Sequence, residues 1–247
     1  MHLLLLGKDG KKYIVHATGG MQKVPGLGVV DTELLMRTKI GDMLELFGER
    51  YIVLKPEPAD YIELIKRKTQ IILPKDTGYI ITKCGISPGK KICEIGVGVG
   101  GLTIFLAFIV GKTGKVFGYE KRKEHIQEAK RNLSVLGLED IVEFFEQDAE
   151  QGISQRGVDA VICDIPEPWK IMGFIKEALR TGAWCACYLP TYNQVEKTVL
   201  AMEKEGFGEI EALEQLLRKL VVVQNAVRPD FSMLGHTGFL VFGRKMV

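Results

Sequence analysis

The sequence lacks any hydrophobic run long enough to cross a membrane and any convincing secretory signal. The amino-terminal run 3–6 has four apolar residues, far fewer than the core of a signal peptide. The segment 102–110 is apolar but too short to span a bilayer. The formal net charge is only +2 over 247 residues, so any nucleic-acid surface must come from local basic clusters or from oligomerisation. We therefore expect a cytoplasmic protein.

Cysteine is also scarce, and no CxxC pair is present. The five cysteines are Cys84, Cys93, Cys163, Cys185 and Cys187. Cys185 and Cys187 lie two residues apart, so on a strand both side chains point to the same face. We expect buried reduced thiols and no metal site.

Two differently patterned regions follow one another along the chain. Residues 1–57 contain short alternating runs separated by many glycines, which predicts a small β-rich amino-terminal domain. The segment 54–60 has two prolines and is expected to act as a linker, with Asp60 capping a helix through 61–68. Residues 58–247 form the second predicted domain.

Strands and helices alternate in this second region. We predict strands at 91–95, 115–120, 141–148, 158–164 and 183–189, and helices at 100–110, 121–137, 169–180 and 193–206. Such repeated units form a parallel, doubly wound α/β sheet with right-handed crossovers. The strand-rich tail after residue 207 predicts an antiparallel hairpin at one edge.

A glycine-rich loop follows the first of these strands. It fits a dinucleotide template through Gly96, Gly98 and Gly101, and an ExGxGxG template through Glu94, Gly96, Gly98 and Gly100. Either match alone is weak. A pyrophosphate would be repelled by Glu94, whereas S-adenosylmethionine has no phosphate and carries an ammonium and a sulfonium. The glycines of this loop and the next two residues, Leu102 and Thr103, are expected to contact this cofactor.

Two further acids end the next two strands. Glu120 lies where a carboxylate accepts hydrogen bonds from ribose hydroxyls, a position that both cofactor classes use. Asp148 is placed to accept a hydrogen bond from an adenine amino group. Together with Glu94 they favour S-adenosylmethionine over a nicotinamide cofactor, and a Rossmann-like class I methyltransferase sheet.

The fourth strand ends in the sequence DIPEPWK, residues 164–170. Two prolines and an acid form a rigid turn at the ligand-binding edge. A helix cap would by itself explain Asp164, but its position predicts that it also faces the sulfonium and the methyl acceptor. Asp164 is therefore assigned to both the catalytic and the cofactor-binding residues.

This segment resembles the D-[LI]-P-x-P-W signature of the tRNA adenine-N1 methyltransferases that act on the T-loop. Segments 67–80, 187–195 and 228–245 resemble the same family, so the similarity covers nearly the whole chain in order. The resemblance implies methylation of N1 of adenine 58, or also 57, in tRNA by a homotetramer. Leu73 departs from the aromatic residue or histidine frequent in the family, which leaves the choice between positions 57 and 58 open.

The resemblance also implies roles for individual residues. Asp164 would hold the exocyclic amine of the adenine and stabilise the cationic product. The base must be extruded from the RNA stack, and Tyr188 corresponds to a tyrosine in the family's pocket. Tyr188 is thus a second catalytic candidate, although a buried strand tyrosine is an equal alternative. Trp169 and His236 are as easily explained by packing and structural hydrogen bonds.

Phosphate contacts are the other requirement of a tRNA enzyme. Basic pairs and triplets occur at residues 66–68, 121–123, 130–131, 218–219 and 244–245, although each is also explained as a solvated face. The apolar segment 216–223 is a candidate for strand-to-strand contacts between subunits. Two alternatives remain: a small-molecule (precorrin-type) or protein methyltransferase, and a non-catalytic tRNA-binding subunit.

Overall fold

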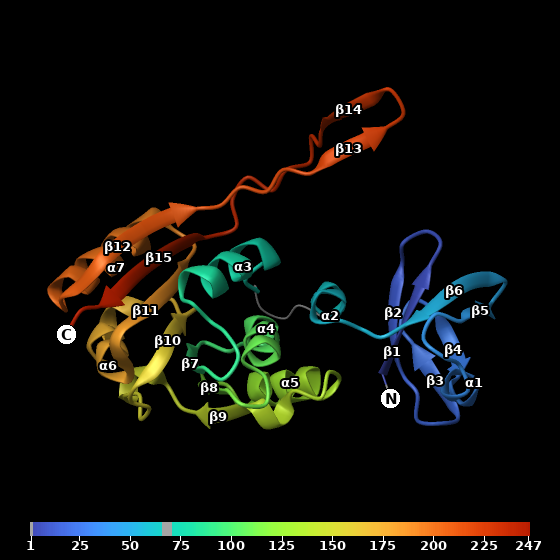
Figure 1. Cartoon of the computed structure of the whole chain (residues 1–247), viewed down its shortest axis with the longest axis horizontal. Coiled ribbons are helices and arrows are strands. Elements are labelled where there is room, and N and C mark those ends of the chain that lie inside the picture. The colour runs from blue at the N-terminus through green and yellow to red at the C-terminus, as the bar shows by residue number, and fades with distance from the viewer. Residues whose placement is uncertain (1, 66–70) are drawn as a thin grey trace.

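A computed structural model describes residues 2–65 and 71–247 of the chain. Its amino-terminal part is a four-stranded antiparallel sheet in the order β2-β1-β6-β5, with a β3–β4 hairpin and one short helix beside it (Figure 1). Buried side chains such as Leu5, Val15 and Val53 form a separate hydrophobic core here. The elements are β1 His2–Gly7, β2 Lys12–His16, β3 Met21–Val24, β4 Gly28–Asp31, α1 Thr32–Met36, β5 Met43–Leu46 and β6 Glu49–Leu54.

The remainder of the chain is built on a seven-stranded sheet in the order β12-β15-β11-β10-β7-β8-β9. The five strands from β11 to β9 are parallel, and β15 runs antiparallel to both β11 and β12. The predicted Rossmann-like α/β fold and the antiparallel edge are therefore confirmed. The strands are β7 Lys91–Ile95, β8 Lys115–Glu120, β9 Val142–Glu146, β10 Val158–Cys163, β11 Leu179–Leu189, β12 Phe207–Glu214 and β15 Phe239–Lys245.

Helices cover both faces of this sheet because successive strand residues point to opposite sides. In β10, Ala160 and Ile162 pack with α3, α4 and α5, whereas Val161 and Cys163 pack with α6 and α7. Both faces are apolar, as expected of a buried parallel sheet. The helices are α2 Pro58–Leu64, α3 Pro74–Lys83, α4 Gly101–Val110, α5 Lys123–Ser134, α6 Met172–Ala178 and α7 Tyr192–Lys204, with short 3-10 turns at Glu139–Ile141, Ala149–Gln151 and Pro168–Ile171.

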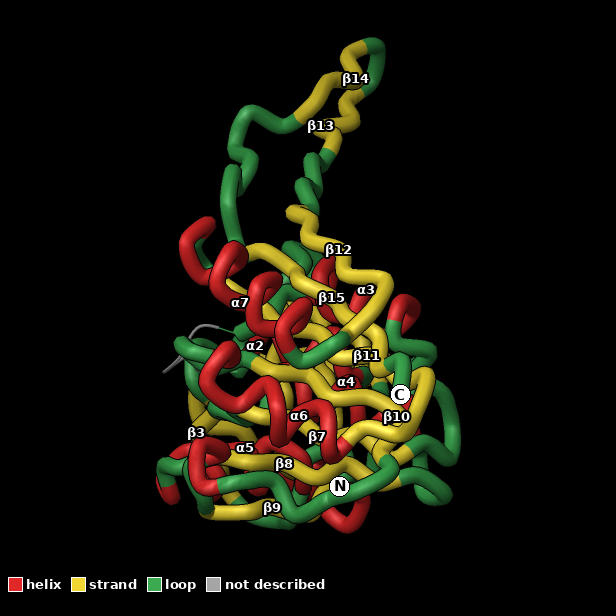
Figure 2. Tube along the Cα trace, turned by 90° about the vertical axis from the view of Figure 1, so that its left-hand side faces the viewer, coloured by secondary structure: helices red, strands yellow, loops and turns green. Residues whose placement is uncertain are grey.

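A two-stranded arm projects away from the sheet between β12 and β15 (Figures 1 and 2). It consists of β13 Leu220–Val223 and β14 Ala226–Pro229, paired antiparallel. Its apolar side chains remain exposed, including Leu220, Val222 and Val227 at 62%, 71% and 64%. The predicted apolar segment 216–223 is thus part of a projecting hairpin.

Several predicted boundaries were wrong, among them those of the helices predicted at 61–68 and 169–180. Asp60 is not the cap of α2, which begins two residues earlier at Pro58; Asp60 instead accepts a hydrogen bond from the Glu57 amide. Proline suits a first helical position because the amide it lacks would be unpaired there. The helix predicted at 169–180 ends at Ala178, because Leu179 already pairs with Val158 in the sheet.

The prediction of buried thiols is confirmed, since all five cysteines are buried and free. The sulfurs of Cys185 and Cys187 lie 3.8 Å apart on one face of β11. Burial raises the pKa of Cys84 to about 12, which makes it unreactive at neutral pH. None of the helices in residues 2–65 and 71–247 is long and apolar enough to cross a membrane.

Candidate functional site

A pocket lies at the carboxyl ends of β7 and β10, where the order of the strands reverses. Ligands of open α/β sheets bind at this point. The Asp164 amide donates to the Ile95 carbonyl over 2.8 Å, which joins the two strand ends. The pocket has a volume of about 460 Å³. Of the predicted site residues, its walls include Glu94, Gly96, Gly98, Gly101, Leu102, Glu120, Asp148, Asp164 and Tyr188.

The glycine loop forms one wall and tolerates no side chain at Gly96. This residue has φ +87°, and a Cβ built on it would lie 2.2 Å from the carbonyl oxygen of Asp164. Gly100 also has φ +87° and packs against Ala129 of α5, where a Cβ would lie 3.1 Å away. Gly100 is therefore needed for packing of the loop and does not itself line the pocket.

Glu94 lies at the base of the pocket and is 2% exposed. Its Oε2 has no hydrogen-bond partner of good geometry among the described residues. Burial raises the pKa of Glu94 to about 8; the hydroxyl of the buried Thr103, which lies beside the carboxyl, opposes this rise, and the nearby Asp164 and Glu120 add to it. A buried acceptor that resists ionisation fits a ligand carrying N–H groups or positive charge.

Glu120 is held by backbone amides on both oxygens. The Gly98 amide donates to Oε2 over 2.9 Å and the Arg122 amide to Oε1 over 3.0 Å. Burial by itself would raise its pKa, but these hydrogen bonds and the Arg122 guanidinium outweigh burial and lower the pKa of Glu120. The carboxylate is thus ionised, links the glycine loop to β8, and retains lone pairs for hydroxyl donors.

Two aspartates complete the acidic wall. Asp148 caps the turn Ala149–Gln151, accepts from the Glu150 amide over 3.1 Å, and lies 3.6 Å from the Lys121 ammonium. Asp164 follows β10 directly. Burial, with the charge of Glu120, raises the pKa of Asp164 to about 7. A carboxyl balanced between its two forms near neutral pH is typical of functional sites.

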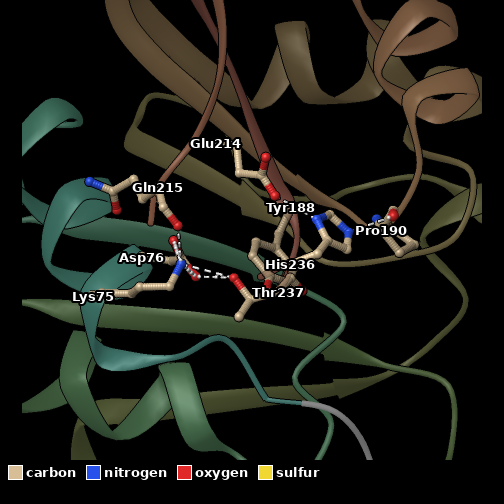
Figure 3. Close-up of polar contacts among 8 residues, drawn as sticks. All are labelled: Lys75, Asp76, Tyr188, Pro190, Glu214, Gln215, His236 and Thr237. Atoms are coloured by element: carbon tan, nitrogen blue, oxygen red, sulfur yellow. Dashed lines mark hydrogen bonds and ion pairs between the residues drawn. The ribbon is translucent and has the colours of Figure 1, made fainter. Parts of the chain in front are cut away.

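Tyr188, near the end of β11, also lines the pocket. It is 4% exposed, and its hydroxyl donates to the Thr237 carbonyl over 2.6 Å (Figure 3). A Cβ on Gly238 would lie 2.3 Å from the Tyr188 ring, so only glycine fits beside it. The ring is therefore fixed by the segment that returns from the arm.

A buried ion pair that was not predicted from the sequence lies next to this ring. The Lys75 ammonium lies 2.7 and 2.8 Å from the two oxygens of Asp76, which is completely buried. It also donates to the Gln215 carbonyl and the Thr237 hydroxyl, each over 2.8 Å (Figure 3). Gln215 leaves β12 and Thr237 enters β15, so one ammonium joins both roots of the arm to α3. A lysine and an aspartate directly after Pro74, at a helix start, were the available signal.

His236 joins the same root to the pocket rim. Its Nδ1 lies 2.6 Å from Glu214 and its Nε2 lies 2.9 Å from the Pro190 carbonyl (Figure 3). Both partners are acceptors, so both ring nitrogens are satisfied only in the imidazolium form. Glu214 first, and the Pro190 carbonyl second, raise the pKa of His236.

Other predicted residues lie outside the pocket walls. Leu73 precedes α3 and is not among the lining residues, although Ile71 and Ile72 are. Trp169 lies on the turn Pro168–Ile171 with the Lys197 ammonium 5.1 Å above its ring. Arg244 and Lys245 donate to the backbone at Gly182 and Leu179, which gives that pair a structural role. The basic triplet 66–68 lies outside the described residues.

The sheet order, the glycine loop and the acids at three strand ends define the class I, S-adenosylmethionine-dependent methyltransferases. Within that class, residues 50–229 match the family described as the tRNA methyltransferase complex GCD14 subunit, and the chain belongs to this family. The resemblance seen in the sequence is thereby confirmed.

Relatives align along nearly the whole chain. It is 32% identical to tRNA (adenine(57)-N(1)/adenine(58)-N(1))-methyltransferase TrmI of Methanocaldococcus jannaschii, over 98% of this chain and 94% of that protein. It is 33% identical to tRNA (adenine(58)-N(1))-methyltransferase TrmI of Thermus thermophilus, over 98% and 96%.

Solved structures agree with this relationship. A SAM-dependent O-methyltransferase of Thermotoga maritima superposes with a TM-score of 0.90 at 32% identity, covering 100% of this chain and 93% of that one. The tRNA (m1A58) methyltransferase TrmI of Aquifex aeolicus gives 0.80 at 31%, covering 100% and 97%. Because the alignments cover 100% of this chain, they include both its amino-terminal sheet and the arm.

Proposed function

We propose that this protein transfers a methyl group from S-adenosylmethionine to N1 of adenine in the T-loop of tRNA, at position 58. The main support for this proposal is the similarity, over nearly the whole chain, to enzymes named for that reaction. The acidic residues that line the pocket also suit this cofactor. A silent tRNA-binding subunit is disfavoured, because it needs neither the buried Glu94 in an intact glycine loop nor Asp164.

We assign the two ends of the pocket to different ligands. Glu94 and the loop Gly96–Thr103 would hold the methionine end of the cofactor, Glu120 the ribose hydroxyls, and Asp148 the adenine amino group. When bound, S-adenosylmethionine supplies a methyl group on an electron-poor sulfonium. Asp164, Tyr188 and Pro190 would then enclose the target base.

N1 of adenine already carries a lone pair, so this chain needs no strong base to create the nucleophile. The ionised form of Asp164 accepts a hydrogen bond from the exocyclic amine, which orients the base. The same carboxylate stabilises the positive charge that develops on the ring as the N1–methyl bond forms. The Tyr188 ring gives the extruded base an apolar surface in place of its stacked neighbours.

Incubation of the protein with unmodified tRNA and S-adenosylmethionine, followed by nucleoside mass spectrometry, tests this function. We expect 1-methyladenosine, mapped to position 58. Asp164→Ala should lower kcat by roughly 10²–10³-fold, the loss typical of one transition-state-stabilising group, and change cofactor affinity much less. Folded protein that yields an O-methylated product or none contradicts the proposal.

Position 57 is the second candidate acceptor, because the Methanocaldococcus jannaschii relative is named for both positions. Transcripts in which adenine 57 or adenine 58 is replaced by guanine separate the two. Methylation that survives loss of adenine 58 assigns activity to position 57. Leu73→His tests whether this position governs the choice.

We further propose a cytoplasmic homotetramer with a boundary between residues 57 and 58 separating the small β-rich domain from the methyltransferase domain. The exposed apolar arm supports the assembly, and a separate core at Leu5, Val15 and Val53 supports the boundary. The cluster Lys121-Arg122-Lys123 at the pocket edge and Arg218-Lys219 at the arm supply positive charge for tRNA.

A further inference from the structure

An aromatic cluster lies beside the pocket and has no part in the mechanism above. The Tyr192 ring packs on Phe239 with centroids 4.5 Å apart, and the His236 ring packs on Phe239 at 4.7 Å. Phe239 is buried, with 7% exposure, whereas Tyr192 is 74% exposed. Phe239 thus supports an outer ring whose free face is turned to solvent.

The backbone places this ring at the rim next to the target base. Tyr192 is the first residue of α7, and the residues two before and two after it, Pro190 and Gln194, both line the pocket. The Gln194 side chain donates to the Pro166 carbonyl over 2.9 Å, in the loop that follows Asp164. Tyr192 therefore lies at the part of the rim formed by Pro190, Gln194 and the loop that follows Asp164.

The cluster is also rigid. The Thr191 side chain caps α7 by accepting from the Gln194 amide, and Leu189 pairs with Phe239 between β11 and β15. His236 is fixed by Glu214 on one nitrogen and by Pro190 on the other. A rigid aromatic face loses little conformational freedom when a flat ligand stacks on it.

The tRNA substrate proposed above offers a flat ligand for this ring, the base of a nucleotide beside the target adenine. A base that enters the pocket remains joined through phosphodiesters to a nucleotide on each side, so those neighbours must pass over the rim. A base detached from its stack regains stacking on an exposed aromatic ring, and any base has a face suited to this.

We propose that Tyr192 is a stacking platform for the base of a nucleotide adjacent to the target adenine. The proposal rests on the tRNA substrate proposed above and adds a second nucleotide-binding subsite outside the catalytic pocket. Tyr192 acts in binding and takes no part in methyl transfer. Its removal should therefore raise KM for RNA and leave kcat at saturating RNA nearly unchanged.

The test uses the full chain and a T-arm stem-loop RNA carrying 2-aminopurine at either neighbour of the target adenine. Wild-type protein and Tyr192→Phe should quench one of the two probes on binding. Tyr192→Ala should lose that quenching and bind the RNA about 5- to 150-fold more weakly, the range for one lost base–aromatic stack. Phe108→Ala, which removes a 52%-exposed ring on α4, is the matched control.

This experiment distinguishes failure of the stacking platform from failure of the proposed function. Unchanged RNA affinity and quenching in Tyr192→Ala overturn the platform alone, because wild-type methylation still supports the function. Weaker RNA binding accompanied by a smaller assembly in size-exclusion chromatography also overturns it, since the ring would then be a subunit contact. Wild-type protein that neither binds nor methylates the stem-loop overturns both proposals. Equal cofactor affinity and melting temperature verify that the variant is folded.

Discussion

Gly96 shows how a single residue decides whether the cofactor loop can form. Alanine at this position would need a left-handed backbone at φ +87° and would drive its Cβ to 2.2 Å from the Asp164 carbonyl oxygen. The backbone strain costs about 1–3 kcal/mol, and the clash would also push β7 and β10 apart. We therefore expect Gly96→Ala to lose measurable cofactor binding in calorimetry. Gly78→Ala, in α3 with no neighbour within 4 Å of its Cβ, should bind normally.

The buried carboxyls make cofactor binding depend on pH. Burial raises the pKa of Glu94 to about 8 and of Asp164 to about 7, above the ordinary 4.5 and 3.8. Folding thus favours the protonated forms, so the stability they contribute is present below about pH 4 and is lost as pH rises to about 8. A cationic ligand favours the ionised forms and must release protons on binding.

We accordingly expect the affinity for S-adenosylmethionine to rise between pH 6 and 8, by up to about tenfold per pH unit for each proton fully released. Calorimetry in buffers of different ionisation enthalpy measures the released protons directly. S-adenosylhomocysteine, which lacks the sulfonium charge, should release fewer. A flat affinity profile with no buffer dependence would show that both carboxyls are already ionised in the free protein.

At the scale of elements, α3 is tied to the arm by one ammonium. Lys75→Met would leave the completely buried Asp76 carboxylate without its counter-charge, and breaking a buried pair on one side costs about 3–5 kcal/mol. We expect that loss in the free energy of unfolding by urea. The double variant with Asp76→Asn should recover part of it. Lys11→Met, which breaks an exposed pair with Asp9, should change the free energy of unfolding far less than Lys75→Met does.

The elements that the sequence predicted best are those in which pattern and packing agree. Strands Lys91–Ile95 and Lys115–Glu120 were predicted to the residue, because their apolar runs are bounded by glycines and charges. Strand β11 was predicted four residues late, since Leu179 joins the sheet through a register shift that leaves no mark in the sequence.

In the candidate site, residues at strand ends could be predicted from the sequence, whereas residues held by long-range contacts could not. Acids at strand ends such as Glu94 and Glu120 could be placed in one pocket, because parallel strands carry their carboxyl ends to one edge. Lys75 could not be found, because its partners Gln215 and Thr237 are 140 and 162 residues away in sequence. The ring contact of Tyr192 with Phe239 could not be predicted from the sequence either, because it depends on the pairing of β11 with β15.

At the scale of the whole molecule, the arm exposes apolar side chains that an isolated chain would leave in contact with water. Exposure of these apolar side chains to water is unfavourable, and a two-stranded hairpin alone is marginally stable. Contact with another copy would bury them, which is why the homotetramer is proposed. The Asp230 amide donates to the Lys219 carbonyl over 2.8 Å, so the hairpin is closed at its base and can be shortened there.

Replacing residues 220–229 by a two-residue Asn-Gly turn tests the assembly, because it leaves the anchored roots at Gln215 and Thr237 in place. We expect light scattering to report a tetramer for the wild type and a smaller species for this variant. Val222→Lys with Val227→Lys keeps the hairpin but charges a cross-strand pair, and it should dissociate the assembly similarly. Cofactor affinity should not change in either variant, since no arm residue lines the pocket. A tetramer that survives both changes would place the subunit contacts elsewhere, whereas a monomeric wild type would contradict the homotetramer itself.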